Sequence, residues 1–275
     1  MPLAAKVVAV LLAAFAAFAA APAFAQERKA ELLWLGQAAF RLTTPTGKVI
    51  LIDPWLTTNP KTPAKWKNLD ELGKVDLILV THGHGDHVGD APALAKKHGA
   101  KLWAPAGLNQ TFLSLGILPA DLVPRMNKSG TIHPFGEQGV KITMTRAEHS
   151  SEFVWKDAAG KDHVHVGGEP VGFLIELENG LKIWHMGDTG LFGDMKLVGD
   201  YYKPDVVLIP IGGHFVMDPK DAAFAVNNWI RPKHAVPMHY GTIPVLKGTP
   251  EEFVRALGST ATKVHAIQPG DRLEF

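Results

Sequence analysis

The fold is decided by residues 75–90, which read Val-Asp-Leu-Ile-Leu-Val-Thr-His-Gly-His-Gly-Asp-His-Val-Gly-Asp. The run from Val75 to Val80 is short, apolar and rich in branched side chains, which is typical of a strand covered on both faces of its sheet. The run stops at Thr81, and four side chains with metal-binding atoms follow within six residues. The sequence therefore predicts a buried strand that leads directly into a metal site.

The four candidate ligands are His82, His84, Asp86 and His87. Side chains two apart in an extended backbone project to the same side, so His82 and His84 can reach the same ion. The glycines beside them let the main chain turn tightly. Imidazole and carboxylate groups are ligands that zinc, iron and manganese accept. The pattern His-x-His-x-Asp-His therefore favours the centre of a metal-dependent hydrolase over a polar loop that is hydrogen-bonded to water.

This pattern resembles the signature of the metallo-β-lactamase superfamily. The resemblance extends over nearly all of the chain after residue 25. Five further segments are similar to one branch of that superfamily, the metal-dependent hydrolases related to ascorbate-6-phosphate lactonase. These segments are Leu35–Phe40, Ile52–Trp55, Gly187–Met195, Ile211–Phe215 and Met238–Thr242.

The resemblance implies both a fold and a ligand set. The implied fold belongs to the α/β (α+β) class and is a four-layer αββα sandwich, with two mixed sheets face to face and helices outside. The implied site holds two divalent metal ions, with zinc as the first choice and manganese or iron as alternatives. One ion would be bound by His82, His84 and His149, the other by Asp86, His87 and His239, and Asp188 would bridge the two.

The last three of these residues, His149, Asp188 and His239, each follow a predicted strand. Strand ends can bring residues that are distant in sequence to one edge of the fold. Taken alone, a histidine after a strand is more often structural, and an aspartate between glycines is often a turn residue. The resemblance is what favours metal binding at these positions.

Two residues are expected to act on the reacting atoms. Asp86 would accept a hydrogen bond from the attacking water and orient it. His214 follows a second buried apolar run, residues 206–211, and resembles a substrate-side histidine of the branch, so we expect it to donate a proton or contact the oxyanion. Asp53 ends another strand and either orients a ligand histidine or is a turn residue before Pro54.

Turn and cap signals predict how several elements begin and end. Asn179-Gly180 between alternating runs predicts a hairpin, and the sequence from Thr249 to Glu252 predicts a capped helix start. We expect Lys263–Ile267 and Arg272–Phe275 to be strands that close the second sheet.

Length and composition favour one domain. A chain of 275 residues with 46% hydrophobic content can bury a full core, and we expect residues 26–275 to form a single hydrolase domain. A formal charge of +1 provides no field to hold a polyanion, so we expect a small-molecule substrate and no nucleic-acid partner. The chain has no cysteine, which leaves histidine and carboxylate to bind metal. A homo-oligomer is left open.

Residues 1–25 are expected to be a cleaved signal peptide. Lys6 supplies a positive charge, residues 7–20 are uninterrupted apolar sequence, and Ala23-Phe24-Ala25 has the form of a cleavage site. The protein would then be exported to the periplasm or secreted, without stable insertion in the membrane. The alternative is an uncleaved anchor, because residues 7–25 are just long enough to span a bilayer.

The expected activity is metal-dependent hydrolysis of a small-molecule lactone, ester or amide. Two divalent ions can lower the pKa of a shared water toward neutrality and so supply hydroxide. A phosphodiesterase is the second interpretation, since the same site accepts phosphoryl oxygens. A non-catalytic metal-binding or sensor protein is the third, and Asp86 argues against it. A flavodiiron-type oxidoreductase is disfavoured, because proteins of that kind have the pattern His-x-Glu-x-Asp, and this chain has His84 in place of the glutamate.

Overall fold

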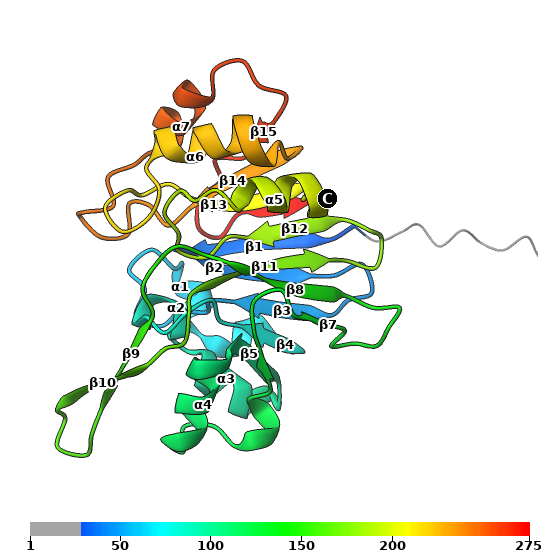
Figure 1. Ribbon diagram of the computed structural model, residues 1–275. Helices are drawn as coiled ribbons and strands as arrows, with labels where there is room; N and C mark the ends of the chain where they lie inside the picture. Colours follow the sequence, from blue (N-terminus) through cyan, green and yellow to red (C-terminus); the bar gives the residue numbers. More distant parts are fainter. Residues whose placement is uncertain (1–28) are drawn as a thin grey trace, which may run out of the picture.

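The computed structural model describes residues 29–275 and shows two seven-stranded sheets packed face to face, with helices on the outside (Figure 1). This arrangement confirms the predicted four-layer αββα sandwich. The expected signal peptide, residues 1–25, lies outside the described residues. Among residues 29–275, every helix is too short or too polar to cross a bilayer.

The first sheet has the strand order β16-β1-β2-β3-β4-β5-β6. Strands β1, β2 and β3 pair antiparallel, whereas β3, β4, β5 and β6 are parallel. Its strands are β1 (Glu31–Gly36), β2 (Ala39–Thr43), β3 (Val49–Ile52), β4 (Leu77–Leu79), β5 (Lys101–Pro105), β6 (Arg125–Met126) and β16 (Arg272–Glu274).

The second sheet has the order β15-β14-β13-β12-β11-β8-β7. Strands β8, β11 and β12 are antiparallel, and the Asn179-Gly180 turn joins β11 to β12 as predicted. Strands β12 to β15 are parallel. Its strands are β7 (Thr131–Ile132), β8 (Lys141–Arg146), β11 (Val171–Glu176), β12 (Lys182–His185), β13 (Val206–Pro210), β14 (His234–Met238) and β15 (Lys263–Val264).

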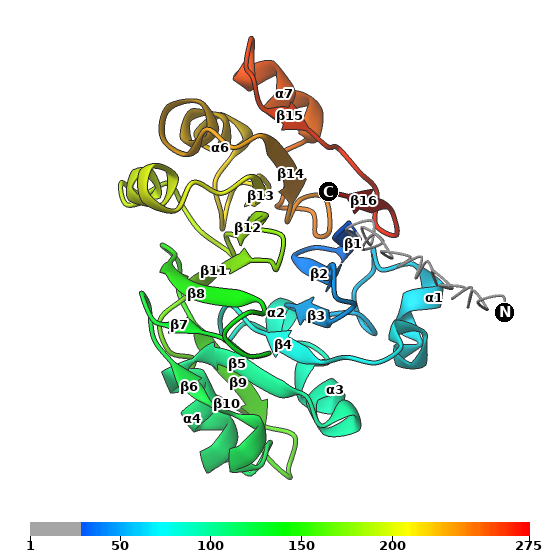
Figure 2. The same ribbon diagram turned by 90° about the vertical axis from the view of Figure 1, so that its right-hand side faces the viewer.

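Helices cover the outer faces of both sheets, with α3 and α4 on one side and α6 and α7 on the other (Figure 2). The predicted N-terminal cap of α7 is present, because the Thr249 hydroxyl accepts a hydrogen bond from the main-chain N–H of Glu252. The longer helices are α3 (Ala91–His98), α4 (Ala106–Ser114), α6 (Pro219–Ala225) and α7 (Pro250–Leu257). Shorter ones are α1 (Ala64–Lys67), η1 (Leu69–Leu72), α2 (Gly85–Val88), η2 (Ala120–Leu122), α5 (Met195–Leu197), and the π-helical turns η3 (Val198–Tyr202) and η4 (Val226–Ile230).

A separate hairpin of β9 (Glu152–Lys156) and β10 (Asp162–Val166) projects from the body of the fold (Figure 1). It leaves the sandwich directly after the loop that carries His149. The base of the hairpin therefore lies beside the predicted site.

The alternation of side chains along each strand builds the layers. In β4, Leu77 and Leu79 join the core between the two sheets, while Ile78 packs under the helices of the first sheet. Both faces of this strand are therefore buried, as its apolar run predicts. Parallel pairing of β4 with β3 and β5 sets the position of the loop that follows.

The last strand differs from the prediction. β15 does close the second sheet, but β16 pairs antiparallel with β1 in the first sheet, where Leu273 lies opposite Leu32. The expectation that both C-terminal strands close the second sheet is therefore wrong. Leu273 packs against the core between the sheets from its new position, so an alternating strand at either sheet edge satisfies the same apolar pattern.

Candidate metal centre

The seven predicted ligands lie in loops that follow strands of both sheets. The cluster at residues 82–87 follows β4, and α2 begins within it. His149 follows β8, Asp188 follows β12, and His239 follows β14. The structure brings all seven together, and their role in binding metal stays a prediction.

The seven side chains form two groups, and within each the potential ligand atoms all lie within 4.8 Å of one another. The histidine group consists of His82, His84 and His149, and the mixed group consists of Asp86, His87, Asp188 and His239. In the histidine group, Nε2 of His82 lies 3.0 Å from Nδ1 of His84. In the mixed group, Oδ2 of Asp188 lies 3.0 Å from Nε2 of His239 and 3.3 Å from Nε2 of His87.

The carboxylate of Asp188 also reaches the histidine group. Its Oδ2 lies 3.6 Å from Nε2 of His149 and 4.0 Å from Nε2 of His82. The side chain is buried. One carboxylate therefore stands between the two groups, at the position that a bridging ligand would take.

Asp53 orients one of the candidate ligands. Its buried carboxylate accepts from the main chain and the hydroxyl of Thr81, at 2.7 Å each, and lies 2.8 Å from Nδ1 of His87. With a proton on Nδ1, Nε2 of His87 is left free to face the mixed group. Asp53 therefore holds Thr81 after β4 and the ring of His87, and the role of His87 as a metal ligand stays a prediction.

His84 is held through its Nε2 atom, whereas His87 is held through Nδ1. Its Nε2 lies 3.0 Å from Oε2 of Glu152, at the start of β9, which leaves Nδ1 facing His82. Glu152 is exposed, in contrast to Asp53. In both groups a carboxylate therefore holds the ring nitrogen that points away from the site.

The donor atoms fit a divalent cation. Among the described residues, Nε2 of His87 and Oδ1 of Asp188 are buried in the mixed group without a hydrogen-bond partner. Buried polar atoms are rarely left unpaired, because the loss of hydration costs free energy. Imidazole nitrogen and carboxylate oxygen are the donors that zinc, manganese or iron would take.

The charges of the two groups differ. Burial and the neighbouring His87 lower the pKa of His82 well below its usual value. In the mixed group burial opposes protonation of His239, but the carboxylates of Asp188 and Asp86 outweigh it and raise its pKa to about 9. The pKa of His87 is likewise raised, against burial, by Asp188. The carboxylates of the mixed group therefore favour positive charge beside them, which protons on these histidines or a bound cation would supply.

A cavity of about 430 Å³ opens onto both groups. Trp55, Phe215 and Ile243 form its apolar wall, and Ser150 adds a hydroxyl. Its other lining residues are Gln37, His84, Asp86, His149, Asp188 and His239, so no lysine or arginine is among the described residues that line it. The volume is that of a small-molecule site.

One cavity wall is fixed to the ligand loop at Gly89. This residue ends α2 with φ 36°, and a Cβ there would lie 2.4 Å from the Cα of Trp55. The next residue, Asp90, accepts hydrogen bonds from the main chain of Leu56 and Thr57 through its carboxylate. The ligand loop and the Trp55 wall are therefore held as one unit.

His214 does not line the cavity. It is exposed, with φ 60°, and its ring lies edge-on to that of Phe215, 4.4 Å between centroids. Phe215, not His214, faces the cavity. The prediction that His214 donates a proton stays a prediction.

Gln37 is the residue that sequence reasoning missed. It lies between β1 and β2, and its carboxamide nitrogen is 2.9 Å from Oδ2 of Asp86 and 2.8 Å from Nε2 of His239. The main-chain carbonyl oxygen of Gln37 accepts a hydrogen bond from the main-chain N–H of His239. The segment Leu35–Phe40 was part of the resemblance, but a glutamine in a hairpin turn has no ligand spacing that would identify it.

The chain is similar to known proteins over most of its length. Residues 48–240 match the family model described as the beta-lactamase superfamily domain. A metal-dependent hydrolase from Polaromonas sp. is 58% identical over 273 residues, which cover 98% of this chain and 99% of the relative. Another from Cupriavidus necator is 62% identical over 249 residues, covering 90% and 86%.

A solved structure is also similar. It is a metallo hydrolase from the hyperthermophilic archaeon Ignicoccus hospitalis, with a TM-score of 0.76 and 33% sequence identity. The match covers 90% of this chain and 98% of that chain. The likeness therefore extends over the whole sandwich.

Proposed function

This chain belongs to the metallo-β-lactamase superfamily and is a metal-dependent hydrolase, and on that premise we propose that it uses two divalent metal ions to cleave a small-molecule lactone, ester or amide. The observation that carries the proposal is the position of Asp188, whose Oδ2 lies within 4.0 Å of histidine nitrogens of both groups. A shared carboxylate is the expected feature of a site for two ions. Zinc is the first choice, with manganese or iron as alternatives.

The ligand residues and their partners have separate roles in this mechanism. Two divalent ions held by these residues would supply hydroxide near neutral pH by lowering the pKa of bound water. Asp86 would accept a hydrogen bond from the attacking water and orient it toward the substrate. Asp53 and Glu152 keep His87 and His84 in the orientation that binding requires. His214, beside the cavity residue Phe215, is proposed to give the leaving group its proton.

The cavity lining favours a lactone, ester or amide over a phosphodiester as the substrate. Its wall of Trp55, Phe215 and Ile243 suits an uncharged, partly apolar molecule. A phosphodiester carries a negative charge, which a nearby lysine or arginine would stabilise, and the described lining residues include neither. The phosphodiesterase is therefore the second candidate, and a non-catalytic metal-binding or sensor protein is the third.

The proposal for localisation rests on the sequence pattern alone. We propose that residues 1–25 are removed during export and that residues 26–275 act as one domain in the periplasm or outside the cell. The charge balance supports a small-molecule substrate and no nucleic-acid partner.

Elemental analysis and a substrate panel test the proposal. We expect about two equivalents of metal per chain and hydrolysis of some member of a panel of lactones, esters and amides, with phosphodiesters weaker. Asp86→Ala should lose most of this activity and His214→Ala part of it, whereas Asp121→Ala, at an exposed position in η2, should not change it. Full activity of Asp86→Ala would contradict the mechanism, and a metal-loaded protein inactive on the whole panel would favour the sensor.

A further inference from the structure

The carboxamide of Gln37 stands where an ion of the mixed group would bind. Its nitrogen contacts Oδ2 of Asp86 and Nε2 of His239, and both atoms are candidate metal-binding atoms. An ion bound by these two atoms would need the space in which the amide nitrogen lies. An ion can therefore enter only if the amide nitrogen moves away.

The main chain gives Gln37 little freedom to withdraw. Its φ of 52° is in the left-handed region, which is unfavourable for a residue with a Cβ and is often retained at functional sites. The main-chain carbonyl oxygen of Gln37 accepts hydrogen bonds from the main-chain N–H of His239 and from the indole N–H of Trp34, both at 3.1 Å. Asp53 and His239 at this site also have positive φ.

The two ends of the carboxamide are in different situations. Oε1 is buried and has no hydrogen-bond partner among the described residues. A half-turn about the last side-chain bond exchanges oxygen and nitrogen with almost no change in shape. After the half-turn, the oxygen would face Asp86 and His239, where it would be repelled by the carboxylate unless a cation lay between them.

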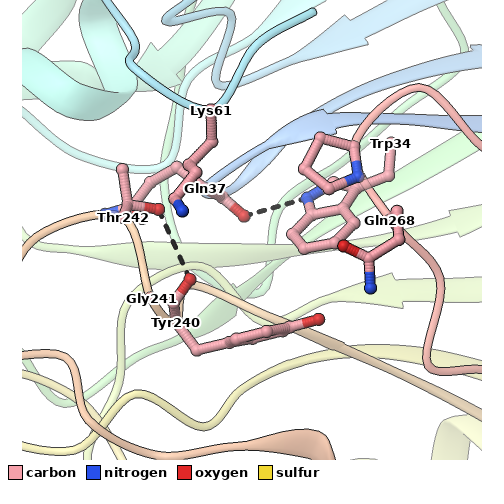
Figure 3. Close-up of a pocket in the computed structure, with 8 residues that line it drawn as sticks. Trp34, Gln37, Lys61, Tyr240, Gly241, Thr242 and Gln268 are labelled. Atoms are coloured by element: carbon pink, nitrogen blue, oxygen red, sulfur yellow. Dashed lines mark hydrogen bonds between the residues drawn. The ribbon is translucent and has the colours of Figure 1, made fainter.

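The exchanged nitrogen would have a place to donate. Gln37 also lines a second, smaller cavity of about 90 Å³, together with Trp34, Lys61, Tyr240 and Thr242 (Figure 3). The cavity has room for water, which is the acceptor that the exchanged nitrogen would need.

We propose that the carboxamide oxygen of Gln37 is a further ligand to the ion of the mixed group, reached by a half-turn of the carboxamide. The proposal rests on the dinuclear function proposed above. It gives the mixed group one neutral oxygen donor that the histidine group lacks. Carbonyl and carboxylate oxygens suit manganese better than imidazoles do, so Gln37 would also shift metal preference between the two groups.

Metal retention tests this role. Full-length protein loaded with Zn²⁺ is challenged with a chromophoric chelator, and release of the two equivalents is followed separately. Gln37→Leu should lower the affinity for one equivalent of metal by roughly 10 to 100-fold and leave the affinity for the other within about twofold of wild type. Gln37→Glu keeps an oxygen and should retain both equivalents. Gln268→Leu, an exposed glutamine on the wall of the small cavity, is the matched control and should behave as wild type.

The outcomes separate the two proposals. Two equivalents in the wild type, both held unchanged by Gln37→Leu, would overturn the role of Gln37 and leave the dinuclear site intact. Loss of the same equivalent in Gln37→Glu and Gln37→Leu would show that the amide N–H matters, and would also overturn the oxygen ligand. A single equivalent in the wild type would overturn the dinuclear site and the Gln37 ligand together. In Co²⁺-loaded protein, Gln37→Leu should intensify the visible absorption, since fewer ligands give stronger bands.

Discussion

The histidine group and the mixed group lie side by side but are built differently. The histidine group offers three imidazoles, and two of its members are partly exposed. The mixed group offers two imidazoles and two carboxylates, and only Asp86 among them is partly exposed. The partner that orients the histidine group, Glu152, is exposed, whereas Asp53 behind the mixed group is fully buried. The mixed group is thus preorganised by the core, and the histidine group by a contact at the surface.

This difference has a chemical consequence. Imidazoles alone favour zinc, whereas added oxygen donors make a site more accommodating to manganese or iron. Buried hydrogen bonds to a charged group contribute more than exposed ones, which water and salt screen. We therefore expect the two groups to differ in metal preference and in their sensitivity to changes in the surrounding residues.

The largest effect is expected from Asp188→Asn, because this residue is the one member shared by both groups. The change removes the charge that lies within 4.0 Å of His82, His149, His87 and His239. Metal content should fall at both groups, and activity should fall by more than the roughly 10 to 100-fold expected for an orienting residue. Elemental analysis and turnover check this. Loss of metal from one group only would show that Asp188 does not bridge.

An intermediate effect is expected from Asp53→Asn. One of the three donors that face this carboxylate would meet an amide nitrogen instead, which costs about 1–3 kcal/mol of unfolding free energy. Affinity for metal in the mixed group should fall roughly 10 to 100-fold. Denaturant unfolding and metal retention measure the two effects.

Glu152→Gln is the matched change at the histidine group. Because Glu152 is exposed, its loss should leave unfolding unchanged and alter metal retention by less than the change at Asp53 does. Equal effects of the two variants would contradict the contrast between a buried and a surface-held group.

The smallest effect is in proton release on metal binding. The pKa of His239 is raised to about 9 by Asp188 and Asp86 despite burial, so near pH 7 an ion entering the mixed group displaces a proton. The pKa values of His82 and His149 are lowered, first of all by burial, so these two histidines release fewer protons there. Calorimetry with Zn²⁺ in buffers of different ionisation enthalpy should assign more proton release to one equivalent than to the other. Equal release from both equivalents would argue against this difference.

The same raised pKa sets a stability trend in the metal-free protein. The pKa of His239 is higher in the folded chain than its ordinary value of 6.5, so the proton on His239 stabilises the folded state. This contribution to the free energy of unfolding is complete below pH 6.5. The contribution is lost as pH rises through about 9. Metal should remove this dependence, because the lone pair is then occupied.

Apolar runs predicted the strand ends, and the His-x-His-x-Asp-His pattern predicted the cluster at residues 82–87, because both are local signals. The sandwich and the assignment of His149, Asp188 and His239 to the site came from the family resemblance. Sequence reasoning failed where pairing is long-range. The pattern of residues 272–275 fits the edge of either sheet, and the choice of β1 as partner depends on how the sheets close. The double role of Asp53 and the contacts of Gln37 depend on segments that meet only in the folded chain.

The close approach at Gly89 bears on how this enzyme could change over evolution. Any side chain there would collide with the main chain at Pro54 and Trp55, so position 89 must remain glycine for the ligand loop to keep this approach. Phe215 and Ile243 on the same cavity are exposed and under no such constraint. New substrate ranges should therefore arise by drift at Phe215 and Ile243, and a laboratory selection would do best to randomise these two and leave position 89 alone.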